Sequence, residues 1–232
     1  MSQAAAWDVA LQLSGAPNTE SVLSRLSQDD WEKMPGALEN SESLSTAILA
    51  TRTASNEALR DLLTRIIAGE LESPDKTPRS VMSLVNKIGK NDLECFLKLR
   101  RVLWKECSSS WTNPRSVIYC MGELRSYPGL LNANELKRLV DLGLIDFGTA
   151  PFESSFPGPL AAKWLVFGDK KIIVTNSKPD TTLYLGHFAL PSDSRHIIDL
   201  YNEPCEMLYD HFEVACTEWS KQGFKINDHI TI

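Results

Sequence analysis

Apolar side chains recur at helical spacing over most of the first hundred residues. Shorter patterns of this kind lie within residues 1–35 and over about Leu38–Thr51, and Ser55 or Asn56 then stands where a helix N-cap is expected. The clearest stripe follows this cap and has the three- and four-residue spacing of one buried helix face: Leu59, Leu62, Leu63, Ile66 and Ile67. The N-terminal region is therefore predicted to be helical.

The stretch GELESPDKTPRS, residues 69–80, separates this stripe from the next. Pro74 blocks continuation of a helix, and Thr77 followed by Pro78 has the form of an N-cap with proline at the first helical position. Another set of apolar residues at helical spacing comes next and ends before Gly89: Val81, Leu84, Val85 and Ile88. The sequence predicts a corner between two helices, with Thr77 capping the second.

Three more helical patterns occupy the middle of the chain. The first opens with a capping box at Asn91, runs through Trp104 and carries a polar stripe on its other side: Glu94, Lys98, Arg101 and Lys105. The second begins at Asn113-Pro114, and the third is capped by Asn132 with Glu135 and ends at Gly143. Helix, turn and helix in this order predict a helix-turn-helix unit whose last apolar residues enter a sheet.

The pattern then changes to short strands. Residues 144–163 are predicted to form a loop, because they are interrupted by Pro151 and by the run Pro157-Gly158-Pro159. Lys163–Phe167 and Lys170–Thr175 flank Gly168-Asp169 as a β-hairpin, and Thr182–Phe188 is a third strand. Helices over Ser192–Tyr201 and about 204–221 follow, and a short strand closes the sequence.

These elements predict a mainly α fold with two domains. Residues 1–110 form a helical domain, and residues 111–232 form a winged-helix-like α+β domain with a small antiparallel sheet. The N-terminus MSQAAAWDVALQ lacks the pattern of a signal peptide, and no run of about 18 apolar residues occurs. Five widely spaced cysteines favour reduced thiols. A cytoplasmic location without membrane contact is expected.

Charge is segregated along the chain, which has a net charge of −6. Residues 1–75 carry 5 basic and 12 acidic side chains, residues 76–138 carry 12 and 5, and residues 139–232 carry 7 and 13. A basic middle between acidic ends is compatible with attraction between segments of the chain. It is also compatible with an acidic protein or a nucleic acid as partner.

Motifs for common chemistry are missing from the sequence. Neither a phosphate-binding glycine loop nor a nucleophile elbow occurs. Cys205, His211 and Cys216 are the best metal-like set, but on one helix His211 would lie about 120° from the two cysteines. The acids of the corner, Glu70, Glu72 and Asp75, are interpreted as solvated. No catalytic residue, metal or cofactor is predicted.

Residues 30–104 resemble a group of uncharacterised bacterial proteins that share a domain of unknown function. Positions matching the group include the segment RIIAGE, Pro74, Ser80 and the set Asp30, Trp31, Leu84, Asp92 and Phe96. Leu136–Ile145 resembles the helix-turn-helix segment that follows in that group. The resemblance implies the fold and a bacterial origin, and the patchy occurrence of the group implies an accessory setting such as phage defence.

Binding is therefore the predicted function. We expect a non-enzymatic protein-interaction or regulatory module, with a protein partner contacting these residues: Lys98, Arg101, Lys105, Trp111 and Trp164. The alternative is a DNA- or RNA-binding winged-helix regulator that reads bases and contacts phosphates with Asn134, Lys137 and Arg138.

Overall fold

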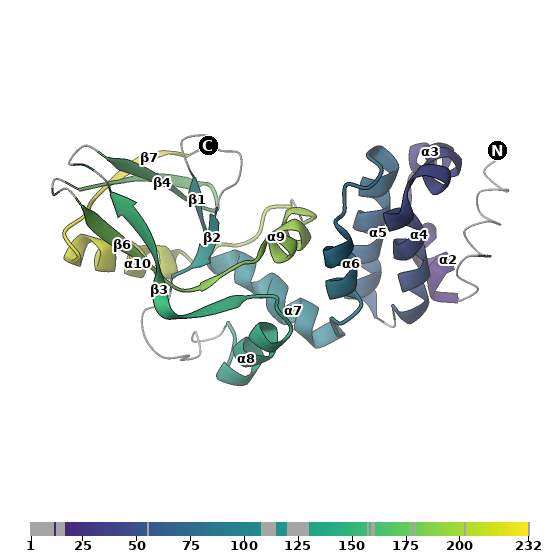
Figure 1. Cartoon of the computed structure of the whole chain (residues 1–232), viewed down its shortest axis with the longest axis horizontal. Coiled ribbons are helices and arrows are strands. Elements are labelled where there is room, and N and C mark those ends of the chain that lie inside the picture. The colour runs from purple at the N-terminus through teal and green to yellow at the C-terminus, as the bar shows by residue number, and fades with distance from the viewer. Residues whose placement is uncertain are drawn as a thin grey trace. The chain divides into compact units, whose positions relative to one another are not determined.

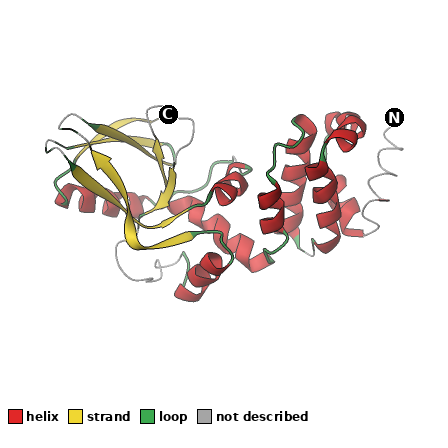
Figure 2. Ribbon diagram, in the orientation of Figure 1, coloured by secondary structure: helices red, strands yellow, loops and turns green. Residues whose placement is uncertain are grey.

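A computed structural model of the 232-residue chain describes residues 12, 17–54, 56–107, 115–119, 130–156, 158, 161–176, 178, 180–201 and 203–231. Helices come first and an antiparallel sheet follows, so the chain is α+β (Figures 1 and 2). It divides into two compact units, a helical unit of Met1–Glu94 with His196–Asn202 and a sheet unit of Cys95–Arg195 with Glu203–Ile232. The two domains expected from the sequence, residues 1–110 and 111–232, stay a prediction.

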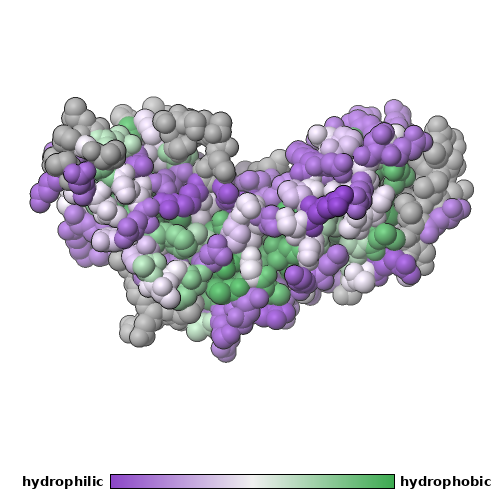
Figure 3. All heavy atoms as spheres, in the orientation of Figure 1, coloured by the Kyte–Doolittle hydropathy of each residue, from purple (hydrophilic) through white to green (hydrophobic). Residues whose placement is uncertain are grey.

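The helical unit is built around one long helix, α5 (Glu57–Glu72). The helices and the 3-10 turn that accompany it are α2 (Pro17–Leu23), α3 (Gln28–Asn40), α4 (Glu42–Ala50), η1 (Thr51–Thr53) and α6 (Arg79–Val85). Helix α5 packs against α2, α3 and α4 and buries the predicted apolar stripe, and the side chain of Asn56 caps it by accepting from the N–H of Leu59. In Figure 3, hydrophilic residues dominate the surface at α3.

The helix expected over residues 38–51 is wrong in its start, because Ser41 lies between α3 and α4. The Ser41 hydroxyl accepts a hydrogen bond from the N–H of Leu44 and so caps α4. Helix α3 runs through the predicted start and has its own capping box, formed by Ser27 and Asp30. In a continuous helix the N–H of Leu44 would bond to a backbone carbonyl of the preceding turn. Because the Ser41 hydroxyl accepts this hydrogen bond instead, one helix can end at Asn40 and the next can begin at Glu42.

The sheet unit contains seven strands in the order β3-β6-β2-β1-β4-β5-β7, and all described pairings are antiparallel. The strands are β1 (Leu103–Cys107), β2 (Arg115–Ile118), β3 (Asp146–Phe156), β4 (Ala162–Phe167), β5 (Lys170–Thr175), β6 (Thr181–Ala189) and β7 (Lys225–Thr231). The remaining elements are α7 (Lys90–Lys98), η2 (Leu99–Val102), α8 (Ala133–Asp141), α9 (Ser192–Asp199) and α10 (Tyr209–Lys221). The units divide within α7 and within α9.

Several strands and helices were correctly predicted in this unit. The hairpin of β4 and β5 turns at Gly168, whose φ of +60° suits glycine, and Phe167 faces Lys170 in the register. Strands β6 and β7 and helices α8 and α9 lie where the patterns placed them. The predicted long helix that starts near residue 204 begins later, at Tyr209.

The helix-turn-helix prediction is wrong in its first helix. Residues 115–118 form strand β2, which pairs with β1 and β6, and the predicted helix through Trp104 ends at Lys98 before strand β1 begins. Residues 146–156, expected to be a loop, form the edge strand β3. The sheet thus has seven strands where a small sheet was predicted.

One face of the sheet packs around an aromatic core together with α10, which lies against the curved sheet in Figures 1 and 2. The indole of Trp104 lies at its centre, with ring centroids 4.8 Å from Trp219, 4.8 Å from Phe167 and 5.4 Å from Phe212. Trp219 donates its Nε1–H to the carbonyl of Tyr184 at 2.8 Å. Large aromatic rings bury extensive apolar surface in this core.

Candidate functional site

The candidate binding site lies on the face of the sheet opposite the aromatic core. Side chains alternate between the two faces of a strand, so Leu165 and Phe167 of β4 point into the core while Trp164 and Val166 point the other way. On β1 and β5 the residues on the same side as Trp164 include Lys105, Lys171 and Ile173. We call Lys105, Trp164, Val166, Lys171 and Ile173 the Trp164 face.

The strand register arranges these residues in two rows across β1, β4 and β5. In the first row Val166 lies opposite Lys105 on one side and Lys171 on the other. In the second row Trp164 lies between Cys107 and Ile173. The first row therefore has a lysine at each end, and the second is apolar.

Lys171 is held over the indole of Trp164. Its Nζ lies 4.0 Å from the ring centroid, which is cation–π geometry. Such a contact contributes about 0.5–1 kcal/mol at an exposed site, and it fixes a flexible lysine at one place on the face. Trp164, Val166, Lys171 and Ile173 are all half-buried.

The ammonium groups of Lys105 and Lys171 lie on this face beside the thiol of Cys107. Burial raises the pKa of the Cys107 thiol above its ordinary value, while the ammonium groups of Lys171 and Lys105 act against that rise and Glu106 adds to it. Both lysines are thus close enough to act on a buried thiol in the apolar row.

Glu106 lies on the other side of β1, at the polar end of the core. Arg115 faces it in the register and donates from Nε to Glu106 Oε2 at 2.9 Å, and the Ser154 hydroxyl donates to Glu106 Oε1. Arg115 Nη2 also donates to the carbonyl of Glu153 at 2.6 Å. This cluster joins β1, β2 and β3, and its groups satisfy each other, so it fits a structural role.

Lys98, Arg101 and Lys105 do not form the predicted stripe on one helix, because they belong to α7, η2 and β1. Arg101 donates from Nε to the carbonyl of Glu206 at 3.0 Å, and its own carbonyl accepts from the N–H of Leu208. It therefore anchors the segment before α10. Lys98 is exposed on α7.

Two of the predicted partner-binding residues come together, although they are 59 positions apart in the sequence. Lys105 and Trp164 lie on the same side of neighbouring strands, because Cys107, two residues after Lys105, faces Trp164. Lys171 was not among the predicted residues, and its alternation with Ile172 in a β-rich run was the signal available for it. Trp111 lies outside the described residues.

The residues of the nucleic-acid alternative share the exposed side of α8. Asn134, Lys137 and Arg138 are all exposed, and their three- and four-residue spacing places them on one face of the helix. Lys137 forms an ion pair of 2.7 Å with Asp141, which lies on the same side. The carboxylate at the end of this stripe lowers its net positive charge.

Among the described residues, no three metal-ligating side chains lie close enough together to hold a metal ion. Cys205 precedes α10, so the assumption that it shares a helix with His211 and Cys216 is wrong. His211 is buried against the aromatic core; burial lowers the pKa of its imidazole from 6.5 to about 4, and a hydrogen bond with the backbone of Val102 opposes the decrease.

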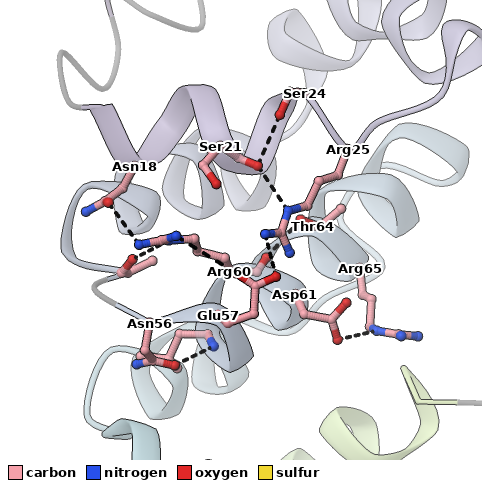
Figure 4. Close-up of polar contacts among 12 residues, drawn as sticks. Asn18, Ser21, Ser24, Arg25, Asn56, Glu57, Arg60, Asp61, Thr64 and Arg65 are labelled. Atoms are coloured by element: carbon pink, nitrogen blue, oxygen red, sulfur yellow. Dashed lines mark hydrogen bonds and ion pairs between the residues drawn. The ribbon is translucent and has the colours of Figure 1, made fainter.

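In the helical unit, a polar network ties α2 to α5 (Figure 4). Arg25 Nη2 lies 2.7 Å from Glu57 Oε1, and Arg25 Nε donates to the carbonyl of Ser21. Arg60 donates from Nε to the carbonyl of Ala54 and from Nη2 to Asn18 Oδ1. These guanidinium groups are satisfied by neighbours within the unit, which indicates a structural role.

Arg65 holds a segment that is far away in the sequence. It forms an ion pair with Asp61 at 2.9 Å, visible in Figure 4, and donates from Nη1 to the carbonyl of Leu200 at 3.0 Å. Its guanidinium also lies 4.5 Å from the ring centroid of Tyr201. The end of α9 is thereby fixed to α5 inside the helical unit.

Comparison with known proteins gave no match to a family model, a curated protein or a solved structure. Among the described helices, none combines the length and apolar character needed to span a bilayer.

Proposed function

We propose that the chain is a non-enzymatic protein-interaction module and that its partner binds to the Trp164 face. One observation carries the proposal: the register of β1, β4 and β5 places two lysines and a half-buried tryptophan on one side of the sheet. Tryptophan is enriched at the energetic centres of protein interfaces. Lysines beside it favour a partner with negative charge.

Protein is the better partner class because of the way Lys171 covers Trp164. A nucleobase that stacked on this ring would compete with the ammonium group located 4.0 Å from the centroid. The neighbouring Val166 and Ile173 offer aliphatic surface, which packs against apolar side chains of a protein and does not read bases.

The second candidate is a nucleic-acid-binding regulator that uses α8. It is supported by the shared exposed side of Asn134, Lys137 and Arg138. Lys137→Glu with Arg138→Glu tests it in a gel-shift titration with salt. Retardation that decreases steeply with salt and disappears in the double variant favours this candidate, and no retardation of DNA or RNA at low salt contradicts it.

The setting that we propose is a bacterial cytoplasm, with phage defence as the system that the module serves. The bacterial origin and the phage-defence system are supported by the resemblance of residues 30–104 and Leu136–Ile145 to an uncharacterised bacterial group, and the cytoplasmic location by the pattern of the N-terminal residues. The function as an interaction module does not depend on this setting.

The experiment for the main proposal compares tagged variants expressed in the native host. Partner recovery is measured by quantitative mass spectrometry for three proteins: the wild-type chain, a first variant that combines Trp164→Ala and Lys171→Glu, and the control variant Lys178→Glu. Lys178 is exposed in the turn after β5 and is not part of the Trp164 face. Its substitution by glutamate changes the charge by the same amount as Lys171→Glu. A protein that is lost only with the first variant supports the proposal. Equal recovery with all three, each folded by circular dichroism, contradicts it.

A further inference from the structure

Positive charge in the helical unit is concentrated in one segment, residues 76–91. The unit contains nine basic and 15 acidic side chains, and this segment holds four of the basic ones and none of the acidic ones. It comprises the end of the corner after α5, helix α6, the turn that follows and the start of α7. A basic segment in an otherwise acidic unit gives a polyanion one place at which to bind.

The backbone of this segment is held in place by buried contacts. The Glu70 carboxylate accepts from the N–H groups of Asp75 and Thr77, one on each side of Lys76. The Ser43 hydroxyl donates to the carbonyl of Thr77 at 3.0 Å, and α6 packs against α4. The apolar side of α6 is buried: Val81, Met82, Leu84 and Val85. The outward side chains therefore project from an ordered backbone, which favours well-defined contacts with a ligand.

Five exposed polar side chains project from this backbone, and we call them the α6 surface: Lys76, Ser80, Ser83, Asn86 and Lys87. Lys76 lies in the corner just before α6. Ser80 and Ser83 are one turn apart on the helix, and Asn86 and Lys87 follow one turn further on, which places these four on the same side. Within the part of the chain that the structure describes, none of the five side chains forms a hydrogen bond or ion pair with another residue.

The two lysines of this surface differ from the basic residues around them. Arg79 and Lys90, which border the surface, each have a carboxylate within 4.0 Å. Lys137 on α8 is likewise ion-paired. Lys76 and Lys87 have no such partner among the described residues, so they contact an anion without first breaking an ion pair.

The composition of the α6 surface matches a phosphate backbone better than a protein. Lysine ammonium groups, serine hydroxyls and asparagine amides are among the groups that contact the phosphate and sugar of nucleic acids. Protein interfaces instead are centred on aromatic or other large apolar anchors. Between residues 76 and 91 the exposed apolar positions are Pro78 and Gly89, and every larger apolar side chain is buried. A basic surface with hydroxyl and amide donors and without such an anchor favours a nucleic acid.

We propose that the α6 surface binds the phosphate backbone of a nucleic acid without reading its sequence. Lys76 and Lys87 neutralise phosphates, and Ser80, Ser83 and Asn86 donate hydrogen bonds to phosphate oxygens. The surface lies on the helical unit and shares no residue with the Trp164 face or with α8. It is a binding site in addition to those two and does not depend on either of them.

Fluorescence anisotropy of labelled probes with the full chain tests this site. The probes are two DNA duplexes of unrelated sequence and one single-stranded RNA, each about 20 nucleotides long, measured between about 50 and 200 mM salt. A labelled polyglutamate peptide represents an acidic protein. A variant that combines Lys76→Gln and Lys87→Gln removes both charges of the surface. The control variant combines Lys33→Gln and Lys178→Gln, at two exposed lysines elsewhere on the chain, and removes the same charge.

The wild-type chain is expected to bind the nucleic-acid probes with an affinity that decreases as salt increases. Loss of the charges of Lys76 and Lys87 is expected to weaken binding at least about tenfold at about 0.1 M salt, and equally for both duplexes. It should also reduce the steepness of log affinity against log salt by about two. The control variant is expected to stay within about twofold of the wild type.

No binding of any nucleic-acid probe at about 50 mM salt overturns the proposal, and so does an equal loss of affinity in the two variants, each folded by circular dichroism. A preference of more than about tenfold for one duplex overturns recognition of the backbone alone. Tighter binding of polyglutamate assigns the surface to an acidic protein instead. Binding that is lost with Lys137→Gln and Arg138→Gln, but retained without the charges of Lys76 and Lys87, places the site on α8 and overturns the assignment to α6.

Discussion

The buried carboxylate of Glu70 accepts a hydrogen bond of 2.6 Å from the backbone N–H of Thr77, across the corner between α5 and α6. Its other oxygen accepts from the N–H of Asp75 at 2.7 Å and from the Ser41 hydroxyl at 2.8 Å. The predicted Thr77 cap is wrong, because Pro78 occupies the N-cap position without a side-chain bond. A glutamate of the preceding helix orders the turn instead.

Glu70→Ala is expected to destabilise the protein by about 2–4 kcal/mol, because it leaves two backbone N–H groups without their acceptor and removes the nearer acceptor of the Ser41 hydroxyl. Glu72→Ala, an exposed change on the same helix, is the control and is expected to cost less than about 0.5 kcal/mol. Urea unfolding followed by circular dichroism measures both. Similar midpoints for the two variants would show that the carboxylate does not hold the corner.

Asp75 has a φ of +58°, in the left-handed region that favours glycine. Asp75→Gly removes this strain at the cost of a 3.3 Å contact between Ser41 Oγ and the Asp75 carboxylate, so a change within about 0.5 kcal/mol is expected. Asp75→Val keeps a side chain that disfavours this region and is expected to lose about 1–2 kcal/mol. Calorimetric melting compares them, and equal melting temperatures would contradict the role of φ.

Arg65→Ala is expected to release the end of α9 from α5. The change removes the bond to the Leu200 carbonyl and the contact with the Tyr201 ring, so amide hydrogen exchange over residues 196–201 should accelerate at least about tenfold. Arg25→Ala, which disrupts the network at α2, serves as the control and should leave this segment protected. Unchanged exchange in the first variant argues against the clamp.

Local patterns predicted the helices well where burial follows a single stripe, as in α5. They failed at Leu103–Cys107, whose order of apolar and polar residues, LWKEC, is also compatible with a helix. This segment forms a strand because it pairs with β2 and β4. Strand β3 contains Gly148 and Pro151 and so resembles a loop. As an edge strand with an irregular register between Phe147 and Phe152, it accommodates both.

The candidate site was less accessible to sequence reasoning than the fold. The sequence predicts Lys105 and Trp164 as separate partner-binding residues, but the reason they come together is the register between β1 and β4. That register is a long-range property, set by the shared core of Trp104, Leu165 and Phe167 on the opposite side. Lys171 joins them through its contact with the Trp164 ring across the hairpin of β4 and β5.

His211 makes stability depend on pH in a defined window. Burial holds the pKa of its imidazole at about 4 in the folded chain, below the 6.5 of an unfolded chain. The unfolded state therefore binds more protons between these values, so the contribution of neutral His211 is complete above pH 6.5 and decreases as pH falls towards 4. The loss amounts to about 2–3 kcal/mol.

His211→Gln removes the titration while keeping a polar side chain of similar size. Denaturant unfolding at half-unit steps from pH 7.5 to 4 should show wild-type stability decreasing more steeply than that of His211→Gln, with the difference confined to the interval below 6.5. Parallel curves for wild type and His211→Gln would mean that the aromatic core takes up the imidazolium without penalty. That outcome conflicts with the packing of His211 against Phe167, whose ring centroid is 5.8 Å away, in a core that burial keeps apolar.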